Sequence, residues 1–535
     1  ITLQAGGNLI TNNINFGAGS TLEFNGPLDG GGNIITYGFK GAIVNGNNAT
    51  LNVNTKLLIA YDPTAGTIAT INIKADNNFA FDASAGDVTI LNGQAIVFED
   101  ANSILTLSNL TGGGVNNILL AADLAAPGAN EGQLIFDGGV NGLNIGSNVA
   151  GTVRNIGNAG GNKFENLFIN HVVTITDDVN LGIHDLVIND NADFTSSTAF
   201  NADAIQINNA TYRIDANGGD LNVPAANIEF AHADAELVLQ NSSNANDRTI
   251  TLGADIDPNN DDEGIVTLNS VNAGRKLTID GGVTFGRAKR LQAIKFQGAG
   301  NLGTVGITFN TANIELDTTG VLELGATTAN VTLINDAVQL TQTGNIGGFL
   351  DFNAKNGTVT LNNNVNVAGA VQNTGGTNGT LIALGASNLN SVNGIAMLKV
   401  GAGAVSITKG GNTSITEIQG NGTALLTLPA NFNLTGSINK TGGQALKLNF
   451  TNGGSVSGVV GTAANSVGDI TTAGATSFAS SVNAKGTATL SGTTSFADTF
   501  TNTGAVTLAK GSITNFAKNV TATSFAANGA TINFG

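Results

Sequence analysis

The most concentrated set of side chains that could bind a metal ion is an acidic run in the stretch ADIDPNNDDEG, residues 254–264. Its D-x-D-x-N spacing is the one with which the calcium loop of an EF-hand begins. The sixth loop position, however, is Asn260 where an EF-hand has Gly, and the twelfth is Val266 where it has Glu. The motif is therefore incomplete, and it predicts only a weak candidate for a Ca²⁺ site, made of Asp255, Asp257 and Asp261. We expect no metal ion and no cofactor.

A dense basic group follows this acidic run. It consists of Arg275, Lys276, Arg287, Lys289 and Arg290. The group has two interpretations. It could contact an acidic partner, either the 255–263 loop of a neighbouring molecule or an anionic host surface, because a local positive patch on an acidic protein attracts negative charge. It could equally lie in a solvated turn and neutralise the acidic run of its own chain. The sequence leaves both interpretations open.

Paired carboxylates raise the question of glycan cleavage, which needs two converging carboxyl groups. The sequence has such neighbours at Glu99-Asp100, Asp177-Asp178 and Asp261-Asp262. Adjacent residues in a strand point to opposite faces, so each of these pairs is more typical of a solvated turn. Aromatic platforms for sugar rings are scarce, since the chain has no Trp and 3 Tyr. Its 3 His share no common spacing. We therefore expect that the chain is not an enzyme.

Composition indicates a folded protein made of strands and turns. Only 11% of residues are charged and 41% are hydrophobic, with 73 Gly. The formal net charge of −17 arises entirely from residues 1–300, because residues 301–535 carry 8 acidic and 8 basic side chains. An acidic chain of this kind repels nucleic acid, so we expect no nucleic-acid partner. The absence of Cys excludes disulfides and thiol chemistry.

The elements that would position these residues are short strands that recur along the chain. The motif Thr-Ser-Phe-Ala occurs at 476–479 and again at 494–497. Four Phe residues follow one another at similar intervals, namely Phe478, Phe496, Phe516 and Phe534. Strands this short cannot each bury an apolar face, but stacked coils can do so together. The pattern predicts an all-β fold, a right-handed parallel β-helix (β-solenoid) of about 18–20 residues per coil with loop excursions, in which the four Phe rings form one buried column.

The repeat is less regular in the first half of the chain. We predict an irregular, acidic part of the β-helix over residues 1–270 and a regular, charge-neutral continuation over 271–535. Excursions are expected at 118–132, as a short helix or flap, and at 254–264, as a solvated loop. The sequence begins at Ile1 without Met, and we expect it to be a portion of a larger protein.

Two stretches resemble a known family. DFNAKNGTVTLNNNVNVAGAV, within 351–403, and GSINKTGGQALKLNF, within 436–492, resemble the passenger region of rickettsial outer-membrane protein B, of the surface cell antigen family of autotransporters. The resemblance is specific over roughly 350–535, and the earlier residues show a similar pattern of short strands and turns. It implies a β-helical passenger that is exported through the periplasm and outer membrane of a Gram-negative bacterium and displayed on the cell surface. We expect that the C-terminal β-barrel translocator of that family is not part of this chain.

The resemblance also implies a function. Such a passenger would act as a structural coat (surface-layer) protein and as an adhesin for attachment to and entry into host cells. Its expected partners are a host-cell surface protein and other copies of itself in a surface lattice. The alternative is a surface-displayed β-helix enzyme that acts on glycans, which would require carboxylates from adjacent coils to converge in a groove.

Overall fold

In the computed structural model, the chain is a parallel β-solenoid throughout the part that the structure describes. That part comprises residues 100–535 without 112, 158–160, 199, 225–226, 422 and 442–445, and, before residue 100, the segments 2–3, 13–15, 21–25, 37–40, 42–44, 49–54, 57–60, 68–73, 78–84, 86–91 and 95–98. Within these residues every regular element is a strand, numbered β1 to β60. No helix with the length and apolar character needed to cross a membrane occurs among them.

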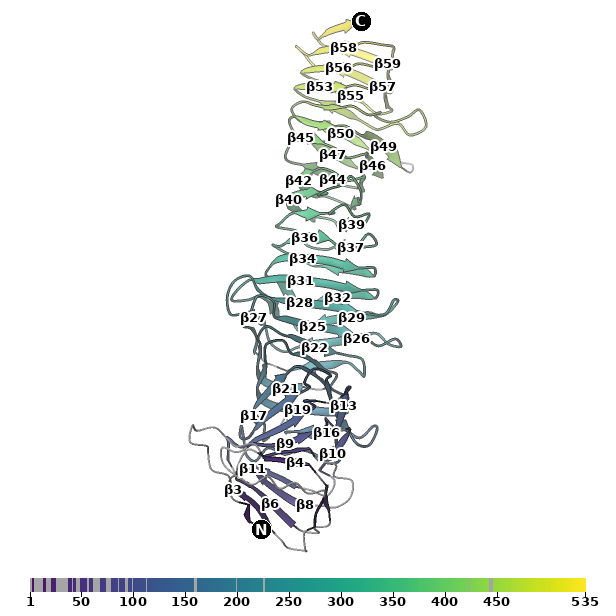
Figure 1. The fold of residues 1–535 in the computed structure, drawn as a ribbon. Coiled ribbons are helices and arrows are strands. Elements are labelled where there is room, and N and C mark those ends of the chain that lie inside the picture. Colours follow the sequence, from purple (N-terminus) through teal and green to yellow (C-terminus); the bar gives the residue numbers. More distant parts are fainter. Residues whose placement is uncertain are drawn as a thin grey trace. The chain divides into compact units, whose positions relative to one another are not determined.

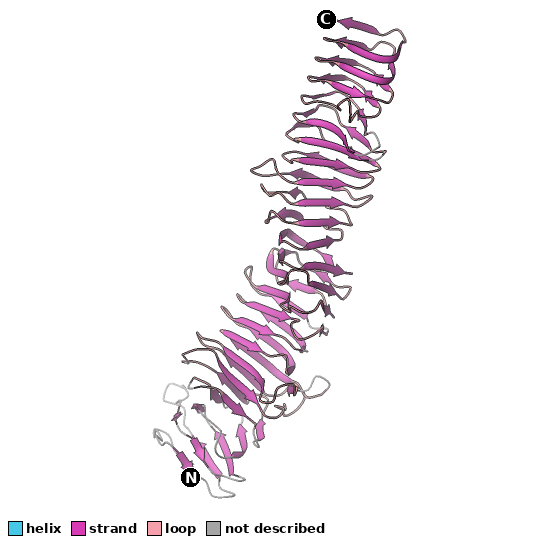
Figure 2. Cartoon of the chain, turned by 90° about the vertical axis from the view of Figure 1, so that its right-hand side faces the viewer, coloured by secondary structure: helices cyan, strands magenta, loops and turns pink. Residues whose placement is uncertain are grey.

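The chain divides into two compact units. The first comprises Ile1–Gln292 with Val305–Ile307, and the second comprises Ala293–Thr304 with Thr308–Gly535. In each unit, strands of successive coils lie side by side and pair in parallel, as Figure 1 shows and as Figure 2 shows from another side. The predicted fold is confirmed in its class, whereas the predicted division at residue 270 concerned regularity and charge and stays a prediction.

In the first unit the strands form the faces of successive coils. One sheet contains β4 (Tyr37–Lys40), β7 (Leu57–Ala60), β9 (Asn78–Asp82), β12 (Ile104–Ser108), β14 (Gln133–Asp137), β17 (Phe164–Asn170), β19 (Val179–Ile188), β21 (Phe200–Ile207), β24 (Asn227–Phe230), β27 (Ile256–Pro258) and β30 (Thr284–Phe285), with β16 (Arg154–Ile156) paired to β19. A second contains β10 (Val88–Ile90), β13 (Asn116–Leu120), β15 (Leu143–Ser147), β18 (Val172–Ile175), β20 (Asp193–Ser196), β22 (Thr211–Asp215), β25 (Glu236–Asn241) and β28 (Glu263–Ser270).

Most of the remaining strands of the first unit lie on a third face. They are β1 (Thr2–Leu3), β3 (Thr21–Asn25), β6 (Ala49–Asn54), β8 (Ile68–Ile73) and β11 (Ala95–Phe98) in one sheet, and β23 (Leu221–Val223), β26 (Arg248–Leu252) and β29 (Lys276–Asp280) in another. The strands β2 (Asn13–Asn15) and β5 (Ala42–Val44) pair in a separate two-stranded sheet. The segment that follows contains β31 (Leu291–Gly298), β32 (Asn301–Val305) and β33 (Thr308–Phe309).

In the second unit three faces continue with few interruptions. The first has β34 (Thr311–Thr318), β36 (Asn330–Leu333), β38 (Leu350–Asp351), β40 (Val367–Gln372), β42 (Ser387–Val392), β44 (Ala404–Ile407), β47 (Leu425–Leu428), β50 (Lys447–Phe450), β52 (Ile470–Thr472), β54 (Val482–Ala484), β55 (Ala488–Leu490), β57 (Phe500–Leu508) and β59 (Val520–Ala527). The second has β35 (Val321–Leu324), β37 (Gln339–Gln342), β39 (Thr358–Leu361), β41 (Thr380–Ala383), β43 (Met397–Val400), β46 (Glu417–Asn421) and β49 (Ser437–Thr441). The third has β45 (Gly411–Thr413), β48 (Phe432–Leu434), β51 (Gly454–Val456), β53 (Ala475–Phe478), β56 (Thr493–Phe496), β58 (Ile513–Phe516) and β60 (Thr531–Phe534).

The core consists of columns of apolar side chains that stack from coil to coil. In β14, buried and half-buried residues alternate, as expected for a strand with one face turned inward. The register of β12, β14 and β17 places Leu105 beside Leu134 and Leu134 beside Leu167, and all three are fully buried. Each column buries apolar surface that one coil alone would leave in water, so the coils stabilise one another.

The predicted Phe column is confirmed for three of its four members. Phe478, Phe496 and Phe516 are 1% exposed, and their rings stack with centroids 5.0 and 5.2 Å apart. Phe534 also stacks on Phe516, with a centroid distance of 5.8 Å, but it is 70% exposed. It lies in β60, the last strand of the sequence. The prediction that all four rings are buried was therefore wrong for Phe534.

Coil length separates the two units. In the second unit the register pairs Asn313 with Asn330, so that this coil is close to the predicted length. In the first unit the register pairs Leu134 with Leu167, across a much longer coil, and then Leu167 with Leu186, across a short one. The predicted coil length therefore describes the second unit, and the long coils of the first unit depart from it.

The two predicted excursions belong to the solenoid. Residues 118–120 lie in β13, and Leu124 forms a parallel bridge with Ile156, so segment 118–132 contains no helix and supplies part of the third face. Segment 254–264 contains β27, which pairs with β24. The many Ala and Leu residues of 118–132 suggested a helix, but Leu120 and Leu124 are buried, and Leu124 pairs with Ile156 of another coil.

Candidate functional site

The basic group lies beside the acidic run, one coil away from it. Arg287 Nη1 is 2.7 Å from Asp255 Oδ2. Arg290 holds Asp262 with two parallel bonds, Nε to Oδ1 at 2.8 Å and Nη2 to Oδ2 at 2.7 Å. This two-pronged geometry is the strong form of an arginine–carboxylate pair. The two arginines therefore neutralise the acidic run of their own chain, which was one of the two interpretations of the sequence.

Backbone hydrogen bonds tie the same two segments together. The backbone N–H of Thr284 donates to Asp255 Oδ1, that of Ala288 to Asp257 Oδ1 at 2.7 Å, and that of Arg290 to Asp261 Oδ1 at 2.8 Å. The bond from Thr284, together with Arg287, holds the pKa of Asp255 below its usual value. The hydrogen bonds from Arg290 likewise lower the pKa of Asp262. The carboxylates thus serve to attach one coil to the next.

The other three cations of the group have different surroundings. Lys276 and Lys289 are exposed, and Arg275 is half-buried in the turn before β29. Within the described residues, none of the three charged groups takes part in an ion pair. The backbone N–H of Lys276 donates to Asp247 Oδ1 at 2.9 Å. The exposed lysines are therefore the members of the group whose charge is available to a partner.

The structure does not bring the weak calcium candidate together. Within the described residues, no cluster of three or more His, Asp or Glu side chains could hold a metal ion. Asp255, Asp257 and Asp261 each direct an oxygen to a backbone N–H of the following coil instead. Three aspartates spaced along a segment that runs beside a neighbouring coil point in parallel toward that coil, whereas an EF-hand loop curls its ligands around one point.

The carboxylate pairs also act within the fold. Asp178 Oδ1 accepts hydrogen bonds from the Ser147 backbone N–H and the Thr176 hydroxyl. Asp100 Oδ1 accepts one from the Asn102 backbone N–H at 2.9 Å, and Glu99 lies outside the described residues. The histidines stand apart: His171 Nδ1 contacts Asp137 Oδ1 at 2.7 Å, and His184 Nδ1 lies 2.9 Å from Asp185 Oδ1. Most of these contacts attach turns to neighbouring residues, whereas His184 and Asp185 both lie in β19.

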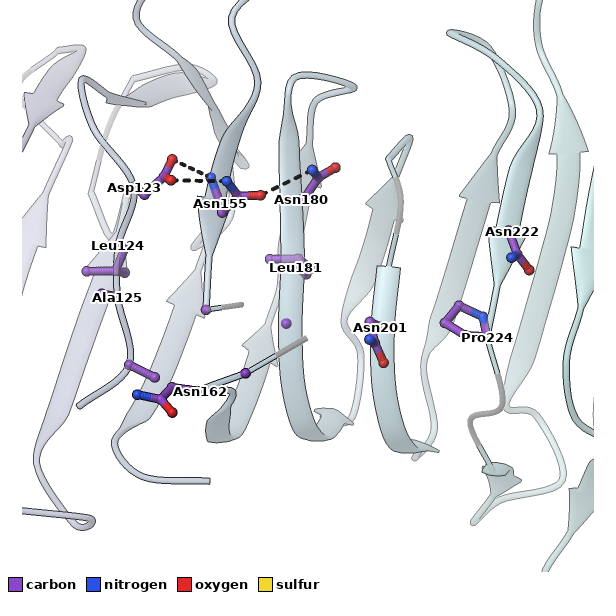
Figure 3. A pocket seen from close by; sticks show the side chains of 14 residues that line it. Asp123, Leu124, Ala125, Asn155, Asn162, Asn180, Leu181, Asn201, Asn222 and Pro224 are labelled. Atoms are coloured by element: carbon purple, nitrogen blue, oxygen red, sulfur yellow. Dashed lines mark hydrogen bonds between the residues drawn. The ribbon is translucent and has the colours of Figure 1, made fainter. Parts of the chain in front are cut away.

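A groove of about 730 Å³ on the first unit, lined by both polar and apolar residues, was not predicted from the sequence. Figure 3 shows the segments that line it, each from a different coil. The labelled lining residues are Asp123, Leu124, Ala125, Asn155, Asn162, Asn180, Leu181, Asn201, Asn222 and Pro224. Asparagine is thus the most frequent side chain in the groove.

Three of these polar side chains form a hydrogen-bonded row. The Asn155 backbone N–H donates to Asp123 Oδ1 at 2.9 Å, and its side-chain Nδ2 donates to Asp123 Oδ2 at 3.0 Å. Asn180 Nδ2 donates to Asn155 Oδ1 at 3.2 Å, and Asn180 Oδ1 accepts from the hydroxyl of Thr198 at 2.9 Å. The dashed lines of Figure 3 follow this row from segment to segment. The carboxamides are thereby fixed in orientation.

The groove lies where the coils of the first unit become short. Residues that pair in succession along the second sheet are Ile145, Ile175, Ser196, Ile214 and Leu239. The coil from Ile175 to Ser196 and the coil from Ser196 to Ile214 contain fewer residues than the other coils of this series. Short coils have few residues beyond those that form the strands, so their surface is recessed between the longer coils. Segments of the longer coils provide the ends of the groove, and Asn180 and Asn201 of the short coils lie between them.

Glycine permits the close approach of backbone at the groove floor. Gly157 has φ +71° and lies against Gly182, so that a Cβ at position 157 would overlap the carbonyl oxygen of Gly182. Both glycines line the groove. The only sequence signal for this site is a set of Asn and Gly residues in separate coils, and these residue types are also the usual ones in turns.

Known proteins of one genus are similar to the chain along its whole length. The chain is 79% identical over 537 aligned residues to outer membrane protein A of Rickettsia conorii, covering 100% of this chain and 26% of that protein. It is 79% identical over 516 residues to outer membrane protein A of Rickettsia rickettsii, covering 96% of this chain and 23% of the relative. The chain thus spans about a quarter of the length of the curated relatives it matches. No family model matches the chain, and no solved structure matches it.

The comparisons correct the sequence resemblance in one respect. The resemblance to outer-membrane protein B led to the right genus and to the right kind of protein, but the similar proteins bear the name outer membrane protein A. The two names belong to related rickettsial surface antigens. The similarity also extends over residues 1–300, where the resemblance by motif was less specific.

Proposed function

We propose that this chain is a surface-exposed segment of a rickettsial outer-membrane protein, and that it acts as a structural coat and as an adhesin for host cells. The observation that carries the proposal is the 79% identity to outer membrane protein A along the whole chain. We further propose that the segment reaches the cell surface through the periplasm and outer membrane and contributes to entry into host cells. Its partners would be a host-cell surface protein and, in a surface lattice, neighbouring copies.

The architecture supports such a role. A solenoid adds coils without long-range closure, so it can form from a chain that emerges progressively at a cell surface. The chain has no Cys, so its folding depends on no disulfide. Stability comes instead from the columns of buried side chains, among them the stacked rings of Phe478 and Phe496. The proposed role is non-enzymatic, in keeping with carboxylates such as Asp178 and Asp262 that bind neighbouring coils.

For attachment, we propose that the exposed cations of the basic group contribute to contact with an acidic partner surface. Lys276 and Lys289 are exposed, whereas Arg287 and Arg290 are engaged with Asp255 and Asp262. A charge-reversing change at Lys276 and Lys289 should therefore weaken attachment without disturbing the fold, since exposed surface positions contribute little to stability. The strength of this contribution should fall with salt, because contacts between exposed charges are screened.

The proposal is tested in two steps. Antibodies raised against the full chain should label intact bacteria, and external protease should remove the label; labelling only after permeabilisation would contradict surface exposure. The purified chain should then bind host cells and reduce bacterial attachment in competition. The variant Lys276→Glu with Lys289→Glu should bind less at low salt, and Lys409→Glu with Lys485→Glu serves as a control of equal charge change. Full binding by the first variant would refute a role for the two lysines, and no binding by the parent chain would refute adhesion.

A further inference from the structure

We propose that the groove on the first unit, with its row of asparagines, binds an extended, neutral glycan chain. The groove lies on the flank where the coils contract, and it has a volume of about 730 Å³. Its side chains belong to consecutive segments of the solenoid, beginning at Asp123 and ending at Pro224 (Figure 3). A ligand that contacts all of them must be elongated and must run from coil to coil, as a polymer does.

The charge of the groove excludes anionic ligands. Among the described residues that line it, Asp123 is the one with a charged side chain, and Lys163, which donates to Asn201 Oδ1 at 2.9 Å, is paired with Asp203. A phosphate, sulfate or uronate group needs an Arg, a Lys or a cluster of free backbone N–H groups, and an acidic groove repels it. The first unit carries the negative charge of the molecule, since residues 1–300 account for the net −17. The ligand is therefore neutral.

The groove is also a poor site for an extended peptide. Peptides that add to a sheet need unpaired backbone groups along an edge. Here the backbone groups pair between coils, as in the bonds from Arg154 N–H to Asp178 O and from Gly157 N–H to Leu124 O, both 2.8 Å. The two large apolar side chains of the lining, Leu124 and Leu181, are each 1% exposed, so they form no open pocket for an apolar peptide side chain. Neither the main chain nor the side chains of a peptide find their usual partners.

Hydroxyl groups, in contrast, match what the groove offers. A carboxamide oxygen can accept two hydrogen bonds and its nitrogen can donate two. In the row, Asn155 Nδ2 donates one bond and Oδ1 accepts one, and the same holds for Asn180. Each carboxamide therefore keeps one donor and one acceptor for a ligand. A sugar hydroxyl can donate one hydrogen bond and accept others. Neighbouring hydroxyls of a glycan can therefore bind the free donor and the free acceptor of each carboxamide.

The row is pre-organised for a repeating ligand. Successive coils of a parallel solenoid stand ~4.8 Å apart, so the four steps from Asp123 to Asn222 cover roughly 19 Å. The hydrogen bonds among Asp123, Asn155, Asn180 and Thr198 hold the polar groups in place before any ligand binds. Side chains that are already ordered lose little freedom on binding, which favours a ligand that makes many weak contacts.

The proposal can be tested by measuring how far the full chain migrates in native gels that contain a polysaccharide. The neutral polysaccharides are dextran, galactomannan, xylan and a β-glucan, and the anionic ones are heparin and polygalacturonate. We expect retardation by at least one neutral polysaccharide. The variant Ala125→Trp, at an exposed position in the groove, should abolish the retardation by filling the space. The double variant Asn155→Ala with Asn180→Ala should weaken binding about tenfold, from the loss of two or more neutral hydrogen bonds.

A matched control uses a second asparagine row on the same coils. Asn189 Nδ2 donates to Asn170 Oδ1 at 2.8 Å, but Asn189 does not line the groove. Asn189→Ala should leave the retardation unchanged, and circular dichroism should show that all variants keep the parent fold. Retardation by anionic polysaccharides alone, by no polysaccharide, or equally for the parent and Ala125→Trp would overturn the proposal. Because the inference does not rest on the proposed coat and adhesin function, either can fail while the other stands.

Discussion

Both units of the molecule bury their apolar side chains between stacked coils, but the coils of the second unit are more regular in length than those of the first. In the second unit, coils of similar length repeat the same residue types at the same places, as in the stack of Phe478, Phe496 and Phe516. In the first unit, the coil that ends at Leu167 is much longer than the coil that begins there. Both bury continuous apolar columns, so stability does not require constant coil length. The change between long and short coils is what creates loops, ion pairs and a groove on the first unit.

The difference extends to charge. The excess negative charge lies in residues 1–300, and residues 301–535 are neutral. In the first unit, carboxylates such as Asp255 and Asp262 bind arginines and backbone N–H groups of the following coil. In the second unit, where charges are fewer, the equivalent connections are often made by Asn, as between Asn433 and Asn412. We infer that regular coils provide stability and irregular coils provide surfaces for recognition.

The largest expected effect concerns the regular columns. Phe496→Ala should destabilise the second unit by about 3–5 kcal/mol, because it removes a buried ring and leaves a cavity. Phe534→Ala is the control, since Phe534 is 70% exposed in the same column. Urea unfolding followed by circular dichroism measures both. Similar losses for the two variants would show that the column does not stabilise the unit through burial.

The next effect concerns the contracted coils of the first unit. Gly157 and Gly151 both have left-handed backbone, with φ +71° and +75°. A Cβ at 157 would overlap the carbonyl oxygen of Gly182, whereas a Cβ at 151 meets nothing within 4 Å. Gly151→Ala should therefore cost about 1–2 kcal/mol through backbone strain alone, and Gly157→Ala should cost more. Thermal unfolding of the full chain provides the comparison, and equal costs would argue against close contact between these coils.

A pH-dependent effect is expected from a buried carboxylate of the second unit. Burial disfavours the charged form of Asp351, but hydrogen bonds from Thr374, Asn353 and Gln372 together outweigh it and lower its pKa. Because the folded pKa lies below the unfolded one, the resulting stability is present above the unfolded value of ~3.9 and is lost as pH falls through the folded pKa.

Asp351→Asn should therefore reduce stability at pH 7 by about 1–3 kcal/mol, the usual contribution of hydrogen bonds to a charged group, and should flatten the loss of stability in acid. The control is Asp336→Asn, at an exposed carboxylate that accepts a hydrogen bond from the Asn356 backbone N–H. Urea unfolding between pH 7 and pH 2 measures both variants. An unchanged acid response in Asp351→Asn would refute the assignment.

The smallest expected effect concerns the exposed ion pairs of the first unit. Arg290→Ala removes the two-pronged contact with Asp262, but both side chains are about half exposed. The melting temperature should fall only slightly, and less at high salt, because exposed ion pairs contribute little and are screened. Lys289→Ala is the control for loss of a charge without an ion pair. A large decrease that persists at high salt would mean that this contact is essential to the fold.

Much of the fold could be predicted from the sequence because its main signal is local. Alternation along a strand and the return of Thr-Ser-Phe-Ala at 494–497 predicted stacked parallel coils, and the register indeed pairs Phe478 with Phe496. The same reasoning failed in the first unit, where Leu124 pairs with Ile156 across a much longer coil. No local pattern marks so variable an interval, so segment 118–132 was misinterpreted as a helix or flap.

The candidate sites show the same limit. The acidic run and the basic group were identified as neighbours, but the pairing of Asp262 with Arg290 depends on a long coil between them. The groove was missed because Asp123, Asn155 and Asn180 are separated by unequal intervals. Only the register of the coils brings them together.

The change of coil length is the central claim of this account, and engineered disulfides test it most directly because the chain has no Cys. Asn144 lies beside Thr174 across a long coil, and Thr174 lies beside Thr195 across a shorter one. Neighbouring parallel strands are ~4.8 Å apart, within the range that a disulfide can span. Oxidation should therefore cross-link both Asn144→Cys with Thr174→Cys and Thr174→Cys with Thr195→Cys, detected by mass and by mobility in non-reducing gels. The double variant Asn144→Cys with Glu165→Cys tests the alternative of uniform short coils. If this variant forms a cross-link and Asn144→Cys with Thr174→Cys forms none, the coils are uniformly short and the described change of coil length is wrong.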